Sequence, residues 1–396
     1  MKVLVVLPFA PWPVRVRCSN LWPRVAREAE VHVTYLDTGL PAGIRPWHLP
    51  NVASVQAIPF SSAKAALRTA LALPSDRPLR VAWNDDEPAR RAVEEAYRRV
   101  RPDVVYAERL RAVPLVKGLP AERLVLDPTD SLPLFCEEVR RRSGAPWRQR
   151  LIEVIEQRRL VAYERKHYAR ATAVVACSPR DAEAMRRSAP DARVEIVANG
   201  VDLAGFPFAP PLRNGGPKVL MSGNFGYWPN KEAAGWLLRQ ARSVRALLGG
   251  EVVFVGANPP SWMVRAGARG DVQTVGFVPD LSAYYHAATA VAAPVRFAVG
   301  SQNKVLEAMA CGRPVVTTPQ CAQGLAPGGR SSVVEARREE FVDALGVLLG
   351  DSERRRSLAQ LGRAYVERHH NWDDIAAQMT GLLTRVAGGA TLRRAA

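Results

Sequence analysis

The 396-residue sequence predicts an α/β protein with two Rossmann-like parallel-sheet domains. Short apolar runs alternate with helical patterns, which is typical of parallel sheets. This alternation occurs twice, and residues 200–217, which are rich in proline and glycine, separate the two series as a linker would. The chain is also long enough to bury two ordinary hydrophobic cores.

The apolar runs are the predicted strands, and the amphipathic stretches between them are the predicted helices. In the first half, the strand ranges are 3–7, 31–35, 104–106, 124–127, 173–177 and 194–197; in the second half they are 218–222, 251–255, 273–275, 290–293 and 313–317. Helices are expected at 87–100, 147–169, 179–188, 231–248 and 281–287. Ligands of open parallel sheets bind beyond the carboxyl ends of the strands, so we expect the two domains to face each other across a cleft.

The composition limits the possible partners without choosing among them. The chain has 55 Lys+Arg against 38 Asp+Glu, a formal net charge of +17, which suits an anionic small molecule, an anionic membrane surface or nucleic acid. The five cysteines are scattered and form no C-x-x-C pair, which favours a reducing, cytoplasmic compartment and no structural zinc site. No run approaches 18 apolar residues, so we expect no membrane span.

Residues 293–318 are the most informative part of the chain. A polar loop with Gly300, Ser301, Gln302 and Asn303 leads into a predicted helix over 304–312 and then a buried strand. A loop that frees backbone N–H groups at a helix N-terminus favours anion binding. Lys304 lies in the first turn, with a carboxylate at position 307 one turn later. The pattern therefore indicates a sugar-nucleotide site, although an ordinary strand–loop–helix scaffold would look the same.

Several motifs follow one another in a recognisable order. They are V-A-N-G-V-D at 197–202, S-G-N at 222–224 with W-P-N-K at 228–231, G-F-V-P-D at 276–280, E-A-M-A-C-G-R-P-V-V at 307–316, and Trp372 near the end. With these motifs the chain resembles glycosyltransferase family 4, whose members have the GT-B fold. The likeness is strong over about residues 170–385 and weak before them. Residues 302–310 are most similar to a bacterial exopolysaccharide-type branch of sugar transferases.

This resemblance implies a division of the chain by function. Residues 1–205 would form an N-terminal acceptor-binding domain, and residues 206–372 would bind the nucleotide-sugar donor. A C-terminal helix, at about 373–396, would cross back to the first domain.

The resemblance also implies a set of site residues. Asp130, Lys304 and Glu307 are the predicted catalytic residues, and Arg17 would face the diphosphate or the acceptor. The predicted donor-binding residues are Gly223, Asn224, Lys231, Phe277, Val278, Arg296, Gly300, Ser301, Gln302, Asn303, Lys304 and Glu307. Two positions depart from the family pattern. The family often has a pair of glutamates, of which Glu307 fits the second, but Val299 stands at the position of the first. Asn224 stands at a position where the family often has an arginine. The backbone at 301–303, together with Arg296 or Lys304, would compensate.

The implied reaction is transfer of a hexose-type sugar, with retention, from a nucleoside diphosphate such as a UDP- or GDP-sugar to an acceptor hydroxyl. The acceptor would be a glycan, a lipid-linked sugar or a small natural product, as in exopolysaccharide or natural-product biosynthesis. We expect no metal and no further cofactor, because there is no D-x-D motif at a strand end. The acidic cluster at 85–87 precedes Pro88 and is predicted to begin a helix.

Three alternatives stay open at this point. The first is a GT-B sugar-nucleotide epimerase, and the second is a basic nucleic-acid-binding protein, which the evenly spread charge does not favour. The third is a peripheral membrane protein, which is compatible with transferase activity. Residues 63–73, which are small or apolar apart from Lys64 and Arg68, would either bind the inner face of a membrane or pack within the protein.

Overall fold

A computed structural model describes residues 1–11, 16–39, 48–141, 146–210 and 218–389. The chain divides into two compact units. Unit 1 comprises Met1–Ala198 and the C-terminal segment that begins at Trp372; unit 2 comprises Asn199–Asn371. The latter part of the expected linker, residues 211–217, lies outside the described residues.

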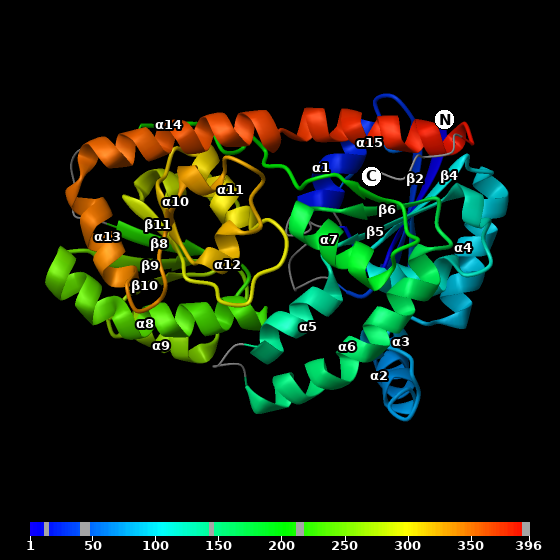
Figure 1. Cartoon of the computed structure of the whole chain (residues 1–396), viewed down its shortest axis with the longest axis horizontal. Helices are drawn as coiled ribbons and strands as arrows, with labels where there is room; N and C mark the ends of the chain where they lie inside the picture. The colour runs from blue at the N-terminus through cyan, green and yellow to red at the C-terminus, as the bar shows by residue number, and fades with distance from the viewer. Residues whose placement is uncertain (12–15, 40–47, 142–145, 211–217, 390–396) are drawn as a thin grey trace. The chain divides into compact units, whose positions relative to one another are not determined.

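Unit 1 is built on a seven-stranded parallel sheet with the order β3-β2-β1-β4-β5-β6-β7 (Figure 1). The strands are β1 (Lys2–Leu7), β2 (Glu30–Asp37), β3 (Ser54–Pro59), β4 (Val104–Glu108), β5 (Leu124–Thr129), β6 (Ala173–Ala176) and β7 (Val194–Ile196). The helices are α1 (Val16–Val25), α2 (Ser62–Leu71), α3 (Leu79–Ala82), α4 (Glu87–Val100), α5 (Leu132–Arg141), α6 (Trp147–Tyr168), α7 (Pro179–Ser188) and α15 (Trp372–Ala387), with 3-10 helices η1 (Leu110–Val116) and η2 (Ala121–Arg123).

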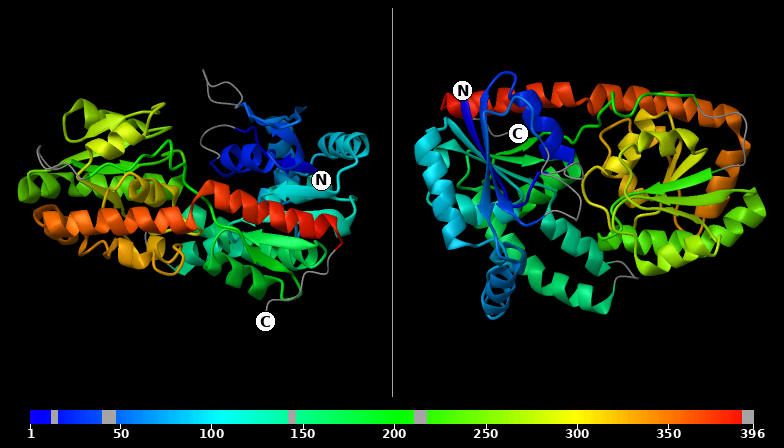
Figure 2. Two further views of the ribbon diagram at one scale, coloured as in Figure 1. Left: turned by 90° about the horizontal axis from the view of Figure 1, so that it is seen from above. Right: turned by 180° about the vertical axis from the view of Figure 1, so that it is seen from behind.

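Alternate residues of β1 serve two different cores. Val3, Val5 and Leu7 pack with α1 and α15 on one face, whereas Leu4 and Val6 pack with α4, η1 and α7 on the other. Both faces of the sheet are therefore covered by helices (Figure 2). This explains why the central strands read as continuous apolar runs without polar alternation.

Unit 2 repeats this plan with a six-stranded parallel sheet in the order β10-β9-β8-β11-β12-β13. Its strands are β8 (Lys218–Ser222), β9 (Glu251–Val255), β10 (Gln273–Val275), β11 (Ala290–Ala293), β12 (Val315–Thr317) and β13 (Val334–Glu335). Its helices are α8 (Trp228–Leu248), α9 (Ser261–Ala268), α10 (Ser282–Ala287), α11 (Asn303–Ala310), α12 (Pro319–Ala322), α13 (Phe341–Gly350) and α14 (Ser352–His369), with the 3-10 helix η3 (Arg330–Ser332).

The core of unit 2 is also divided by its sheet. Val219 and Met221 of β8 face a cluster that includes α8, α9 and α13. Leu220 faces the opposite cluster, to which α11 and α14 contribute. The short helix α11 thus packs on one face of the sheet with its apolar residues buried, and its first turn follows the loop that leaves the carboxyl end of β11.

The C-terminal helix α15 belongs to unit 1, as the sequence predicts. It packs against α1, where Arg24 Nε and Arg27 Nη1 each lie 3.1 Å from Asp373 Oδ1. Trp372, the first residue of α15, is buried in the same core. Among the described residues, no helix combines the length and the apolar character that crossing a membrane requires.

Two strands have no counterpart in the predicted set. Strand β3 lies at the sheet edge, has only one buried residue and ends in Pro59, so it carries neither a hydrophobic run nor an alternating pattern. Strand β13 is only two residues long. The predicted helix start after the acidic cluster is confirmed, because α4 begins at Glu87 with Pro88 in its first turn.

Candidate functional site

Two glycines at the carboxyl ends of β8 and β9 allow a close approach of backbone and side chain. Gly223 has φ +146° and Gly256 has φ +145°, a region that residues with a side chain rarely adopt. A Cβ on Gly256 would lie 1.9 Å from the carbonyl oxygen of Gly223. A Cβ on Gly223 would lie 3.3 Å from Lys304 Nζ. The lysine ammonium group therefore lies directly against the turn that follows β8.

Lys304 is the second residue of α11, and its side chain is buried. Its Nζ donates a hydrogen bond to Asn230 Oδ1 at 2.5 Å. In the described part of the chain, no carboxylate oxygen lies within ion-pair distance of this Nζ. Burial lowers the pKa of Lys304 to about 8, although the Cys321 thiol and Glu307 act in the opposite direction. The cation is thus desolvated and is held by a neutral amide oxygen.

The first turn of α11 has no side-chain cap. Gln302, at the N-cap position, makes no side-chain hydrogen bond to the helix. Gly300, with φ +65°, turns the preceding loop, and Ser301 Oγ anchors it by donating to Gly324 O at 2.8 Å. Asn303 Oδ1 is buried and has no hydrogen-bond partner among the described residues. Uncapped N–H groups and the helix dipole both favour negative charge at this point.

Glu307 lies one turn after Lys304 and is held by a chain of hydroxyl groups. Tyr285 donates to Glu307 Oε2 at 2.8 Å, and Ser222 Oγ lies 2.7 Å from the same tyrosine oxygen. Burial raises the pKa of Glu307, while the hydrogen bond from Tyr285 and the charge of Lys304 oppose that rise. The carboxylate is therefore fixed in direction, with its other oxygen able to accept from a bound hydroxyl group.

The other predicted donor-binding residues differ in their surroundings. Asn224 Oδ1 accepts from Gly226 N at 2.9 Å and from the Asn258 amide at 3.0 Å, so its side chain stabilises the turn after β8. Lys231 is exposed on α8, and the side chain that reaches Lys304 is its neighbour Asn230. Val278 and Arg296 are partly buried, whereas Phe277 is exposed.

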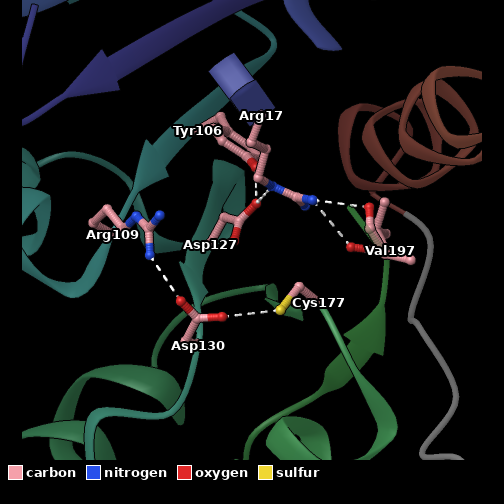
Figure 3. A network of polar contacts seen from close by, with 8 residues as sticks. Arg17, Tyr106, Arg109, Asp127, Asp130, Cys177 and Val197 are labelled. Atoms are coloured by element: carbon pink, nitrogen blue, oxygen red, sulfur yellow. Dashed lines mark hydrogen bonds and ion pairs between the residues drawn. The ribbon is translucent and has the colours of Figure 1, made fainter. Parts of the chain in front are cut away.

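Arg17 is engaged within unit 1 (Figure 3). It is the second residue of α1 and is 4% exposed, so it is no surface cation. Its Nε lies 2.7 Å from Asp127 Oδ2, and its Nη1 donates to the carbonyl oxygens of Val197 at 3.1 Å and Ala198 at 3.0 Å. Burial alone would lower the pKa of Arg17, but the charge of Asp127 raises it above the usual value.

Asp130 lies in the turn directly after β5 (Figure 3). Its Oδ2 is 3.1 Å from Arg109 Nη1, and its Oδ1 accepts from the Cys177 thiol at 3.1 Å. Burial raises the pKa of Cys177 well above its usual value, and the nearby carboxylate adds to this effect. Asp130 is thus a partly exposed side chain with two neighbours that hold its orientation.

The acidic and thiol groups near Asp130 also meet the distance criterion for a metal site. One ligand atom each from Asp130, Cys177 and Asp181 lie within 4.8 Å of one another. However, Asp181 Oδ1 accepts from the Ser131 backbone N–H at 2.8 Å, and its Oδ2 accepts from the Ser178 hydroxyl. These bonds give the carboxylate a structural role at the start of α7, and a metal would have to displace them.

Sequence reasoning missed three side chains that build the site in unit 2. Asn230 belongs to the W-P-N-K motif, but a lysine attracts attention first when a phosphate site is sought. Ser222 ends a strand, and Tyr285 lies in a short helix that looks like ordinary core. Only the contact of Tyr285 with Glu307, 22 positions away, shows its role.

Part of the chain matches a known protein family. Residues 216–351 match the family model described as "Glycosyl transferases group 1". No curated protein matches this sequence.

The whole chain is also similar to solved structures. One is WaaG, a glycosyltransferase involved in lipopolysaccharide biosynthesis, with 16% identity, a TM-score of 0.65, and coverage of 96% of this chain and 99% of WaaG. Another is Anabaena HepE in complex with UDP-glucose, with 16% identity, a TM-score of 0.65, and coverage of 97% and 99%. A third is a UDP-forming α,α-trehalose-phosphate synthase from Burkholderia vietnamiensis, with 12% identity, a TM-score of 0.64, and coverage of 99% and 98%.

At these identities the solved structures establish the fold, which is GT-B, with two Rossmann-like parallel-sheet domains. The family model covers most of unit 2, including β8, Lys304 and Glu307. Residues 216–351 therefore match the group 1 glycosyl transferases, and the chain as a whole has the GT-B fold.

Proposed function

We propose that this protein transfers a hexose from a UDP-hexose to an acceptor hydroxyl group, with retention of anomeric configuration and without a metal ion. The observation that carries the proposal is Lys304, a buried ammonium group with no carboxylate partner in the described residues, at the uncapped first turn of α11. A buried cation without compensation is unfavourable by itself, and a diphosphate would supply the missing negative charge. The UDP-glucose complex of HepE, which has the same fold, supports UDP as the carrier.

The chemical demand on the protein lies in the leaving group. Breaking the anomeric C–O bond puts positive charge on the sugar ring and negative charge on the departing diphosphate. A fixed cation and fixed N–H groups stabilise that negative charge most strongly in the transition state, because it grows as the bond breaks. In this proposal Lys304 and the first turn of α11 have that role, and Gly223 lets the diphosphate approach the backbone closely.

Glu307 and Asn303 would position the donor. The Glu307 carboxylate, oriented by Tyr285, would accept hydrogen bonds from the ribose hydroxyl groups. Asn303 Oδ1, which is buried without a partner among the described residues, is a further acceptor for a hydroxyl group of the donor. The exposed Phe277 and the partly buried Val278 would border the base.

Asp130 is our candidate for the residue of unit 1 that assists at the sugar. In this proposal the donor phosphate takes the proton from the acceptor. Positive charge develops on the sugar ring, and a carboxylate near the ring would stabilise it. The Asp130 carboxylate is partly exposed and is held by Arg109 and Cys177. Asp130→Asn would lower kcat with little change in donor affinity if this assignment is right.

The acceptor is proposed only by class. We expect a glycan, a lipid-linked sugar or a small natural product, in exopolysaccharide or natural-product biosynthesis, with the enzyme acting in the cytoplasm. Unit 1 would select the acceptor and unit 2 the donor. No observation in the structure favours the epimerase or the nucleic-acid-binding alternative.

The proposal is tested by measuring UDP binding and sugar transfer in the full chain and in the Lys304→Gln/Glu307→Gln variant. UDP-, GDP- and dTDP-sugars are first compared by thermal shift, because a ligand that binds only the folded state raises the melting temperature. The selected radiolabelled donor is then incubated with candidate acceptors. Loss of one group that stabilises the leaving diphosphate should raise the barrier by about 2.7–4 kcal/mol, or about 100- to 1,000-fold in rate.

Lys218→Gln is the matched control, because Lys218 is exposed at the amino end of β8, the opposite end of that strand from Gly223. It should leave both binding and turnover unchanged. Turnover that survives in the double variant would contradict the proposal. Free epimer without an acceptor product would instead indicate the epimerase.

A further inference from the structure

The first half of α6 has its acidic residues inside and its apolar residues outside. Between Trp147 and Arg158, the fully buried side chains are Glu153 and Glu156, both 0% exposed. The large apolar side chains of the same stretch face solvent: Trp147 is 70% exposed, Leu151 54%, Ile152 42%, Val154 48% and Ile155 40%. This arrangement is the reverse of what a helix packed on a hydrophobic core requires.

The buried glutamates explain why the helix keeps this orientation. Glu153 pairs with Arg80 and accepts from the Cys136 thiol of α5 at 2.9 Å. Glu156 Oε1 accepts from the backbone N–H of Leu79 at 2.8 Å, at the start of α3. These contacts fix the inner face of α6 against α3 and α5, beside which it lies in Figure 1. The apolar side chains of the outer face stay 40–70% exposed, and leaving that surface in water is a net cost.

The exposed apolar residues form one continuous surface, which we call the α6 apolar stripe. Trp147, Leu151, Val154 and Ile155 stand at positions i, i+4, i+7 and i+8, which share one side of a helix, and Ile152 widens it. Exposed arginines accompany this stripe: Arg140 at the end of α5, and Arg148, Arg150 and Arg158 on α6. Arg141 is also exposed, but it pairs with Glu137. No exposed residue of the stretch 146–158 is acidic.

We propose that the α6 apolar stripe binds the surface of an anionic lipid bilayer. In this arrangement the helix lies in the plane of the membrane, with the stripe inserted among the acyl chains and the arginines at the lipid phosphates. Exposed tryptophan, aliphatic side chains and flanking arginines are the residues that such interfacial helices use. Arg148 lies with its guanidinium 5.4 Å from the centre of the Trp147 ring, a pairing that suits the headgroup level.

Charge decides between this partner and two others. In a symmetric pair of two copies, the same arginines would face each other with no exposed carboxylate in the stretch to neutralise them, which opposes association. Nucleic acid would satisfy the arginines, but Leu151, Ile152 and Val154 would have nothing to pack against. An anionic bilayer satisfies both the positive charge and the apolar stripe.

The α2 segment, which sequence analysis considered for the same task, is less suited to it. Leu67 and Leu71 are 62% and 70% exposed. Arg68, however, is bound to Asp86 at 3.2 Å and to the Trp83 carbonyl, so its charge is neutralised within the protein. Leu67→Ser/Leu71→Ser is therefore a useful comparison for variants of the α6 apolar stripe.

The experiment measures binding of the full chain to vesicles by flotation. Vesicles of phosphatidylcholine are compared with vesicles that also contain phosphatidylglycerol. The wild-type protein should float only with the anionic vesicles, and less so at high salt. Leu151→Asp/Ile155→Asp should lower the partition coefficient by at least about tenfold, because two buried aliphatic side chains are lost. Arg148→Gln should lower it by about fivefold.

Trp147 provides a second, direct readout. Brominated lipids should quench its fluorescence, and Trp147→Phe should remove most of that quenching while the protein still binds. Leu361→Asp, at a residue of α14 that is 47% exposed, is the control for adding a charge at an exposed leucine and should bind like the wild type. Because all these positions are exposed, melting temperatures should be unchanged.

Three outcomes would overturn the proposal. One is failure of the wild-type chain to float with anionic vesicles. Another is that the Leu151→Asp/Ile155→Asp variant floats as well as the wild type. This includes the case in which only the α2 variant, Leu67→Ser/Leu71→Ser, fails to float. The third is a dimer in analytical ultracentrifugation that these two substitutions dissociate, without any vesicle binding. UDP affinity is measured on the same samples, so failure of membrane binding is distinguishable from failure of the proposed transferase function.

Discussion

Each unit of this protein buries a basic side chain near the carboxyl ends of its strands, yet the two have different partners: a carboxylate in unit 1 and a neutral amide in unit 2. In unit 1, Arg17 is paired with Asp127 and with two backbone carbonyl groups, and its pKa is raised above the usual value. In unit 2, Lys304 has an amide oxygen as its partner, and burial lowers its pKa to about 8.

The comparison separates a structural cation from a proposed binding cation. A buried charge that is already paired with a carboxylate has little to offer a ligand, whereas one held by a neutral group gains from an incoming anion. Both residues look equally suited to phosphate in the sequence. The electrostatic surroundings, and not the residue type, distinguish their roles.

The largest expected effect is on folding. Arg17→Met should lower the free energy of unfolding by about 3–5 kcal/mol, because Asp127 would be left buried without its charge partner. Lys304→Met should be neutral or stabilising, because it removes a buried charge that lacks a carboxylate partner in the described residues. Urea denaturation of the full chain measures both variants. Equal losses of stability would remove the distinction between the two sites.

The second prediction converts the Lys304 site into one like that of Arg17. Asn230→Asp would place a carboxylate at the lysine ammonium group, which is 2.5 Å from the present amide oxygen. This carboxylate competes with the diphosphate, and UDP affinity should fall by about 10- to 100-fold in calorimetry. Asn230→Ala, which adds no charge, should cost less, about threefold to tenfold. If the two variants bind UDP equally, charge compensation is not what controls the site.

The third prediction concerns pH. The free protein has a Lys304 pKa of about 8, and a bound diphosphate would raise it. At a pH between the Lys304 pKa of the free protein and that of the complex, UDP binding takes up a proton. UDP affinity should therefore fall by up to about tenfold per pH unit as the pH rises above about 8. Below that pH this group contributes no dependence.

Calorimetry between pH 7 and pH 9.5, in buffers of different ionisation enthalpy, measures both the affinity and the proton uptake. Lys304→Arg is the control, because a guanidinium stays protonated throughout this range. An affinity that is constant across the range in the wild-type protein would contradict an uncompensated lysine.

The smallest effect is expected at Tyr285. Tyr285→Phe removes the hydrogen bond to Glu307 and should weaken donor binding by about 0.5–1.5 kcal/mol, or about twofold to twelvefold. Because that hydrogen bond holds the pKa of Glu307 down, the pKa should rise further in the variant. Tyr284→Phe, at the neighbouring and less buried position of α10, is the matched control. Equal effects of the two substitutions would argue against a role for Tyr285 in orienting the carboxylate.

Much of the fold is predictable because it depends on local patterns. The bounds of α4 and α7 agree with the sequence prediction, and each of these helices has proline in its first turn, which marks its start. The central strands are apolar runs because both faces of their sheets are covered. Strand β3, by contrast, is set by pairing along one edge of β2 and has little pattern of its own.

The candidate site is predictable only in part. The sequence alone places a lysine and a glutamate one turn apart at the start of a helix, next to glycine-rich strand ends, because helical periodicity and glycine stops are local. It does not show that Asn230 reaches Lys304 across 74 positions, or that Arg17 is paired with Asp127 across 110. Nor does it show that α6 turns Glu153 inward and Leu151 outward. Burial and pairing between distant segments decide each charge's state, and only the tertiary structure brings those segments together.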